Sequence, residues 1–248
     1  MKIAVAGKGG TGKTTFSGIL ARILDEEGKN VIAIDADPDM NLHTSLGISE
    51  LPTPVSKLKE LIEERTVMGS GLYRLNPKVN DVLDNFSIKK NKIRLLVMGT
   101  VETGGSGCVC PESTFLRALL RHLILKEEDW VILDMEAGIE HLGRRTAENV
   151  DLMVVIVEPG QRSIDTANRI KELSKGIGIK NIAAVANKIT HDEQIEFIKS
   201  SIDMPLLGSI PYDENIVNAD IQGKSPYDLN KNSISVESIK AILRSIGG

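Results

Sequence analysis

Residues 2–24 read KIAVAGKGGTGKTTFSGILARIL, and they carry the strongest indication of the fold in this sequence. It begins with KIAVA, a short apolar run that is typical of a buried strand. A glycine-rich loop follows at 7–14. Beyond the loop, apolar residues recur at the spacing of one helix face, at Phe16, Ile19, Leu20, Ile23 and Leu24. A strand, a glycine loop and a helix in this order predict the start of a parallel α/β fold.

The loop GKGGTGKT fits the pattern G-x-x-x-x-G-K-[ST], whose backbone N–H groups cradle nucleotide phosphates. We expect Lys13 to reach the β- and γ-phosphates and Thr14 to bind Mg²⁺. A chance match on a glycine-rich turn is the alternative, but the strand before the loop and the helix after it favour a nucleotide site. The residues of the loop expected to contact the nucleotide are Gly7, Lys8, Gly9, Gly10, Thr11, Gly12, Lys13, Thr14 and Thr15.

Short apolar runs alternate with amphipathic segments along the rest of the chain. This alternation predicts one domain over residues 1–248, built on a doubly wound, mostly parallel sheet. The stretch of about 47–92 does not show this alternation. We expect an insertion there, with a helix near 55–65 and a hairpin-like piece near 72–82. After the first strand, the runs expected to form strands are 31–36, 93–99, 130–135, 152–158, 182–188 and 205–211.

Composition narrows the class of protein. The net charge of −4 comes from 30 basic and 34 acidic residues without a basic stripe, so we expect no nucleic-acid partner. No apolar run reaches the roughly 18 residues of a membrane helix. The first residues do not resemble an export signal and the chain has only two cysteines, which favours a cytoplasmic protein with reduced thiols.

A second Mg²⁺ ligand is expected where the apolar run WVILDM ends, at Asp134. An aspartate at the end of a buried strand is suited to hold Mg²⁺, often through water. Gly138, four residues on, could give its N–H to the γ-phosphate and move when that phosphate leaves.

Lys8 is a lysine that the general loop pattern does not require. A solvated surface lysine is one interpretation, and a cation that crosses a dimer interface to the partner's phosphates is the other. The pattern KGGTGKTT at 8–15 resembles the deviant Walker A family of P-loop NTPases, which includes the nitrogenase iron protein and the MinD and ParA ATPases. The resemblance implies an ATP-sandwiching homodimer with Lys8 supplied in trans, an effect worth about 10³–10⁵ in rate for arginine fingers.

The same resemblance implies further roles. Asp37, followed by Pro38, would orient or deprotonate the attacking water, with Asp35 or Asp39 nearby toward Mg²⁺; acidic residues in an ordinary turn are the alternative. Asn187 and Lys188 end one apolar run and Pro211 ends the next, and in relatives these positions recognise adenine. ATP is expected as the nucleotide because the guanine motif is absent, the sequence at 187–190 being NKIT.

Both cysteines, Cys108 and Cys110, lie in CVCPE at 108–112. Thiolates favour soft metals, and a two-fold dimer would offer four of them, a tetrathiolate site for nickel or zinc on the symmetry axis. Two unrelated small residues or a redox dithiol are the alternatives. Pro111 suits the first position of a helix and Glu112 its first turn.

The flanking blocks GCVCPESTFLR at 107–117, DMEAGIEHLGRRTA at 134–147 and NPKV at 76–79 resemble the carbon monoxide dehydrogenase accessory proteins (CooC) and the acetyl-CoA synthase maturation factors (AcsF). The likeness runs from residue 1 to about 215. It implies an ATPase that binds nickel through the cysteine pair and helps insert it into the client enzyme. Glu136, Glu140 and His141 lie beside the second switch, where a polar helix start is favoured over metal ligation.

Three rival functions stay open on the sequence. An iron–sulfur electron-transfer ATPase like the nitrogenase iron protein would carry a cysteine just after the second switch, and MEAGIEH at 135–141 has none. A spatial regulator like MinD or ParA would end in a membrane helix with a basic polar face, whereas we expect a last helix packed on the sheet. A passive metal store would bind nickel or zinc without turnover.

Overall fold

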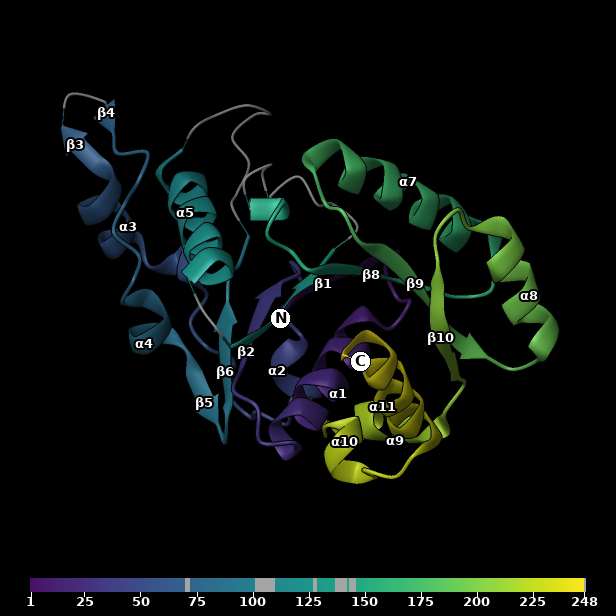
Figure 1. The fold of residues 1–248 in the computed structure, drawn as a ribbon. Coiled ribbons are helices and arrows are strands. Elements are labelled where there is room, and N and C mark those ends of the chain that lie inside the picture. Colours follow the sequence, from purple (N-terminus) through teal and green to yellow (C-terminus); the bar gives the residue numbers. More distant parts are fainter. Residues whose placement is uncertain (70–71, 101–109, 127–128, 137–141, 143–145, 248) are drawn as a thin grey trace.

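An eight-stranded sheet forms the centre of the computed structural model, which describes all residues except 70–71, 101–109, 127–128, 137–141, 143–145 and 248 (Figure 1). Every neighbouring pair of strands is parallel apart from the last, which is antiparallel. The strands in sheet order are β10 (Leu206–Pro211), β9 (Ile182–Ile189), β8 (Leu152–Val157), β1 (Lys2–Gly7), β7 (Trp130–Met135), β2 (Val31–Ala36), β6 (Ile93–Val97) and β5 (Ile88–Lys90).

Helices cover both faces of the sheet, as the doubly wound prediction requires (Figure 1). One face is covered by α3 (Lys59–Thr66), α4 (Val82–Phe86), α5 (Pro111–Lys126), α7 (Gln161–Ile177) and α8 (Asp192–Ser201). The other carries α1 (Lys13–Glu26), α2 (Leu42–Ser45), α10 (Pro226–Leu229) and α11 (Ile234–Gly247), with α9 (Glu214–Ile221) beside α10. All seven strands expected from the sequence are present.

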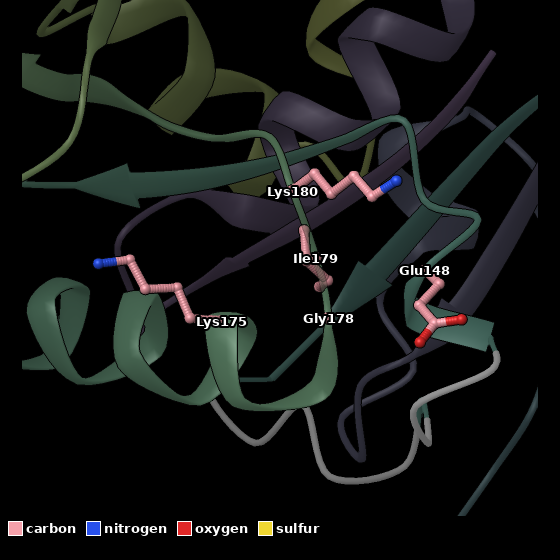
Figure 2. A pocket seen from close by; sticks show the side chains of 5 residues that line it. All are labelled: Glu148, Lys175, Gly178, Ile179 and Lys180. Atoms are coloured by element: carbon pink, nitrogen blue, oxygen red, sulfur yellow. The ribbon is translucent and has the colours of Figure 1, made fainter.

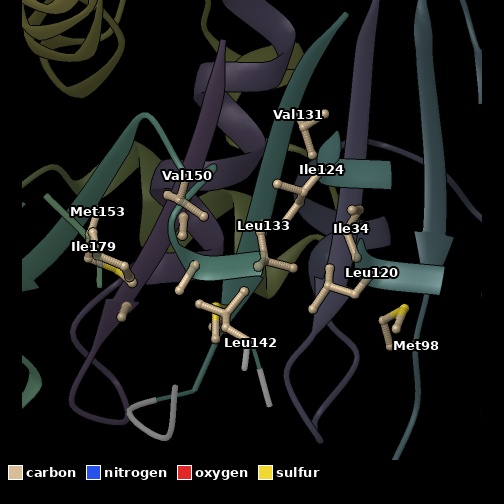
Figure 3. Close-up of a cluster of buried hydrophobic side chains, with 14 of the residues drawn as sticks. Ile34, Met98, Leu120, Ile124, Val131, Leu133, Leu142, Val150, Met153 and Ile179 are labelled. Carbon is tan, nitrogen blue, oxygen red and sulfur yellow. The ribbon is translucent and has the colours of Figure 1, made fainter. Parts of the chain in front are cut away.

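The strand sequences are continuously apolar because successive side chains enter different cores. In β2, Ile32 and Ile34 pack on the side of α5, whereas Val31 and Ala33 pack on the side of α1. Figure 3 shows part of the first core, where Leu120 and Ile124 of α5 lie among Ile34, Val131 and Leu133 of the strands. Two buried faces fix the strand registers on which the site depends.

The segment expected as an insertion differs from the prediction in its second half. A short 3₁₀ turn (Val55–Lys57) and α3 confirm the expected helix. The hairpin, however, is formed by β3 (Val67–Gly69) and β4 (Leu72–Tyr73), so it lies earlier than 72–82. Gly69 has φ 89°, which glycine adopts without strain, and this allows the chain to turn there. Strand β5 then rejoins the main sheet before residue 92.

The last helix packs inside the molecule. The apolar side of α11 faces β10 and α1, and Val236, Ile239, Ile242 and Leu243 are buried. This arrangement confirms that α11 is a helix packed on the sheet. In the described part of the chain, no helix is both long enough and apolar enough to cross a membrane.

Candidate active site

The phosphate loop connects the end of β1 to the start of α1, at the carboxyl edge of the sheet, where doubly wound folds bind ligands. Inside the loop, the backbone N–H of Thr11 donates to the Lys8 carbonyl at 3.2 Å and its hydroxyl donates to the same oxygen at 2.8 Å. No side chain caps the start of α1. Its first N–H groups are therefore available to an anion, and its dipole favours one.

At two loop positions a side chain would clash with the neighbouring strands. Gly12 has φ 95°, and a Cβ there would lie 2.4 Å from Nδ2 of Asn187. At Gly7, a Cβ would lie 2.6 Å from the Ile156 carbonyl oxygen of neighbouring β8. The loop is thus pressed against β8 and β9, which holds its backbone in one shape. Gly9 is exposed and open, while Gly10 has a positive φ, of 80°.

Lys13 of the phosphate loop forms an ion pair with Asp37. Lys13 is only 5% exposed, and its Nζ lies 3.8 Å from Oδ2 of Asp37. The other oxygen of Asp37 accepts the N–H of Asp39 at 3.1 Å. The sequence prediction that Asp37 belongs to the same site as Lys13 therefore agrees with the geometry, although its role in hydrolysis stays a prediction.

Asp134 is the last but one residue of β7, the strand that pairs with β1, and is fully buried. Its Oδ1 accepts the Ser17 hydroxyl at 3.0 Å, whereas Oδ2 is buried without a hydrogen-bond partner among the described residues. Burial raises the pKa of Asp134 to about 7, against the opposite effect of the Thr14 and Ser17 hydroxyls. An unsatisfied carboxylate oxygen beside a threonine hydroxyl fits the oxygen ligands that Mg²⁺ requires.

Asp35 was expected, as the alternative to Asp39, to lie toward Mg²⁺. It lies opposite Asp134 in the pairing of β2 with β7, and each of its oxygens accepts one backbone N–H. Oδ1 accepts the Asp37 N–H at 3.1 Å and Oδ2 accepts the Leu42 N–H at 3.0 Å. Burial raises the pKa of Asp35 to about 6. Asp35 therefore shapes the segment that carries Asp37, and a role of Asp35 or Asp39 toward Mg²⁺ stays a prediction.

The end of β9 braces the phosphate loop. Asn187 is 7% exposed, and its Nδ2 donates to the Thr11 carbonyl at 2.7 Å. Lys188 adopts φ 59° and donates from Nζ to the Gly10 carbonyl at 2.6 Å. Adenine recognition by Asn187, Lys188 and Pro211 stays a prediction. The sequence did not predict that Asn187 supports the phosphate loop, because Thr11 and Asn187 are 176 positions apart in the chain.

Glu158 and Ser17 were also missed. Glu158 follows β8 directly, and its carboxylate lies 3.5 Å from Nζ of Lys8 and 3.3 Å from Nζ of Lys188. A lone acidic residue after an apolar run and before Pro159 was the only signal for Glu158 in the sequence.

Thr15, which was predicted to contact the nucleotide, is half-buried in the first turn of α1, next to Thr14.

Cys110 lies immediately before α5, which returns the chain to the amino end of β7, so the start of this helix is on the same sheet edge as the phosphate loop. Its half-buried Sγ accepts the Ser113 N–H at 3.4 Å, so it caps the helix. Pro111 is the first residue of α5 and Glu112 lies in its first turn, as predicted. Cys108 and Gly138, with Glu140 and His141, lie outside the described residues.

A hollow elsewhere on the surface is not part of this site. It is lined by Glu148, Lys175, Gly178, Ile179 and Lys180 (Figure 2). These residues lie just before the starts of β8 and β9 and at the end of α7. The hollow is therefore at the amino edge of the sheet, opposite the phosphate loop.

Comparison with known proteins agrees with this site. The CobQ/CobB/MinD/ParA nucleotide binding domain family matches residues 2–227. The chain is 48% identical to the carbon monoxide dehydrogenase accessory protein CooC of Rhodospirillum rubrum, over 93% of this chain and 90% of that protein. It is 44% identical to an uncharacterized ATP-binding protein of Methanocaldococcus jannaschii, over 99% and 97% of the two chains.

Solved structures share the fold. A ParA family ATPase from Chlorobium tepidum superposes with a TM-score of 0.74 at 18% identity, over 99% of this chain and 98% of that chain. MinD of Pyrococcus horikoshii, complexed with Mg-ADP, gives 0.70 at 20% identity, over 99% and 95%. The resemblance to CooC-type proteins and to the wider ATPase family is confirmed. The chain therefore belongs to the CobQ/CobB/MinD/ParA nucleotide-binding domain family and is a P-loop ATPase.

Proposed function

We propose that the protein is an ATP-hydrolysing maturation factor that works as a homodimer and delivers nickel to carbon monoxide dehydrogenase or acetyl-CoA synthase. The observation that carries this proposal is the position of the Cys110 thiol on the same sheet edge as the phosphate loop. When a soft metal ligand and a nucleotide site lie on one edge of the sheet, binding at one of them can change the affinity of the other. The relation to a carbon monoxide dehydrogenase accessory protein supports the choice of client.

In the proposed reaction the chain's own residues bind and orient ATP. The loop N–H groups and the start of α1 hold the phosphates, and the buried Lys13 ammonium neutralises the β- and γ-phosphate oxygens. Thr14 and Asp134 would hold Mg²⁺, which when bound neutralises charge that develops on the phosphates. Asp37 orients the attacking water and accepts its proton. Lys8 acts on the triphosphate of the other subunit.

Nickel is the cargo of this cycle, bound by Cys108 and Cys110 of both subunits. Each subunit supplies half of the thiolates, so metal binding depends on the dimer. Zinc would fit the same four thiolates, since it prefers tetrahedral sulfur ligands. Hydrolysis would loosen the dimer beside the client enzyme and release the metal.

The rival functions differ from this proposal in measurable ways. A MinD-type membrane regulator would present a free apolar helix face, whereas α11 packs its apolar side against β10 and α1. An iron–sulfur protein would be brown and absorb visible light when purified without oxygen. A passive store would bind metal equally well after Lys8→Ala or Asp37→Asn.

The decisive experiment is the nickel stoichiometry per dimer, measured by metal analysis after equilibrium dialysis with and without ATP. We expect one nickel per dimer with ATP, and loss of binding in the Cys108→Ala/Cys110→Ala double variant. Nickel retained by that variant at full stoichiometry, or nickel bound equally to separate subunits, would overturn the proposal.

A further inference from the structure

Glu158 holds two lysines of the phosphate loop region with one carboxylate. Its Oε1 lies 3.5 Å from Nζ of Lys8, and its Oε2 lies 3.3 Å from Nζ of Lys188. The backbone of Glu158 is fixed as well, because its N–H donates to the buried Ser163 hydroxyl in the first turn of α7 at 3.1 Å. The carboxylate is therefore held beside the loop by its own strand and helix.

The two lysines are not equivalent partners. Lys188 also donates to the Gly10 carbonyl, so it has a second partner at the loop that does not depend on Glu158. For Lys8, Glu158 is the only ion-pair partner among the described residues, and the Lys8 side chain is 38% exposed. Lys8 can therefore leave while Glu158 keeps a cation beside it. The exchange leaves no buried charge unpaired, which makes it a low-cost movement.

In this arrangement Lys8 is turned toward its own chain's Glu158. Lys13 is the lysine at the mouth of the loop, close to Asp37. A lysine that is to reach a second subunit must first separate from Glu158. A triphosphate carries several negative charges, whereas Glu158 carries one and already shares it with Lys188, so the phosphates of a partner compete well for Lys8.

We propose that Glu158 is a positioning residue that holds Lys8 within its own subunit and releases it when ATP in a second subunit approaches. This inference rests on the proposed function, since it requires an ATP-dependent dimer. Glu158 would keep the isolated subunit from presenting a free ammonium, and it would make the dimer depend on the full charge of the triphosphate.

The test compares Glu158→Gln with the native protein in two measurements. The first is the dimer dissociation constant at a saturating concentration of a non-hydrolysable ATP analogue, measured by analytical ultracentrifugation. An exposed ion pair changes an equilibrium constant by up to about five-fold. Because two such pairs break per dimer, we expect the dissociation constant of the variant to fall by up to about 25-fold.

The second measurement needs no dimer. The rate at which an acylating reagent modifies Lys8 in nucleotide-free protein is followed by mass spectrometry, and we expect it to rise in Glu158→Gln. Glu172→Gln is the matched control, since it removes the same charge from an exposed pair with Lys175 farther along α7. Glu158→Ala must change both quantities in the same direction as Glu158→Gln, and the melting temperature of each variant checks folding.

Each result decides the inference. A faster modification of Lys8 together with a tighter dimer supports it. An unchanged or weaker dimer in Glu158→Gln, or an equal change in Glu172→Gln, overturns it while leaving the proposed function intact. If the native protein forms no dimer with the analogue, the proposed function itself fails, and the inference fails with it.

Discussion

Asp134 is buried with one oxygen that has no partner in the described structure, and this has a consequence for stability. Its pKa is about 7 in the folded protein, against about 4 in the unfolded chain. Between these values the folded state keeps a proton that the unfolded state has lost. The free energy of unfolding therefore falls as the pH rises from about 4 to 7, by up to about 4 kcal/mol from this group, and then levels off.

Asp134→Asn should remove the contribution of Asp134 to the fall of the unfolding free energy with pH, measured in protein free of Mg²⁺ and nucleotide. The variant keeps an acceptor for Ser17 and never has to carry a buried charge, so we expect it to be more stable than the native protein at pH 8 and to have lost Mg²⁺-dependent ATP hydrolysis. Urea unfolding at pH 5 and pH 8 measures the difference. Asp84→Asn, at an exposed carboxylate, is the control. Parallel pH profiles for Asp134→Asn and the native protein would contradict the prediction.

Asn187 offers a test between bracing and base recognition. Asn187→Ala removes the hydrogen bond to the Thr11 carbonyl, and losing a buried bond of this kind costs about 1–3 kcal/mol. Because the bond supports the loop, we expect the affinities for ATP and for inorganic tripolyphosphate to fall by the same factor, about ten-fold. Calorimetric titration with both ligands measures this.

Asn181→Ala is the matched control, because Asn181 directly precedes β9 at the edge of the sheet away from the phosphate loop. This variant should bind both ligands normally. A loss confined to ATP would instead show that Asn187 recognises adenine.

For single residues, the sequence predicted the groups expected to contact the nucleotide and Mg²⁺ better than the residues that hold those groups in place. Lys13, Thr14 and Asp134 were predicted because their motifs carry a mechanism. Asn187 and Glu158 act through contacts with residues more than a hundred positions away, and no local pattern encodes such a contact. The family resemblance placed Asp35 or Asp39 toward Mg²⁺ without deciding between them, and it did not predict that Asp35 accepts two backbone N–H groups of the segment that follows it.

Helix α5 begins at the thiol that is proposed to bind nickel, so structural and metal-binding roles of Cys110 must be separated. Cys110→Ala removes the acceptor for the Ser113 N–H, and losing a cap costs about 1 kcal/mol. Cys110→Ser restores a good capping oxygen but is a poor ligand for a soft metal. We expect the serine variant to match or exceed native stability and the alanine variant to be less stable, while both lose nickel.

Chemical denaturation and metal analysis on the same preparations check this prediction. Full nickel binding by Cys110→Ser, with normal stability, would show that the thiol serves only as a cap.

At the scale of elements, apolar periodicity predicted the strands and helices that have two buried sides or one clear face. It predicted the β3–β4 hairpin less well, because both strands are short and exposed and hence carry little pattern. Strand β5 was missed for a similar reason: it has three residues and pairs at the sheet edge.

At the scale of the whole molecule, the class of fold followed from alternation alone, but the order of the strands did not. The sequence does not say that β1 lies between β7 and β8, or that Asp35 faces Asp134 across a strand pair. These neighbours arise from the packing of both cores, to which residues from the whole chain contribute. The motifs identified Lys13, Thr14 and Asp134, and the topology brings them together with Ser17 and Glu158, which no motif identified.

Coupling between nucleotide and metal is the property of the assembled molecule that the proposed function requires. If ATP and nickel both favour the closed dimer, then each must tighten the binding of the other by the same factor, and such couplings usually amount to about 5- to 150-fold. We expect calorimetry with a non-hydrolysable ATP analogue to give a lower nickel dissociation constant than without it, and nickel to lower the analogue's constant equally. Cys110→Ser should make nucleotide binding independent of nickel. If both ligands bind the native protein and neither changes the affinity of the other, the two sites on this sheet edge are not linked and hydrolysis cannot drive metal release.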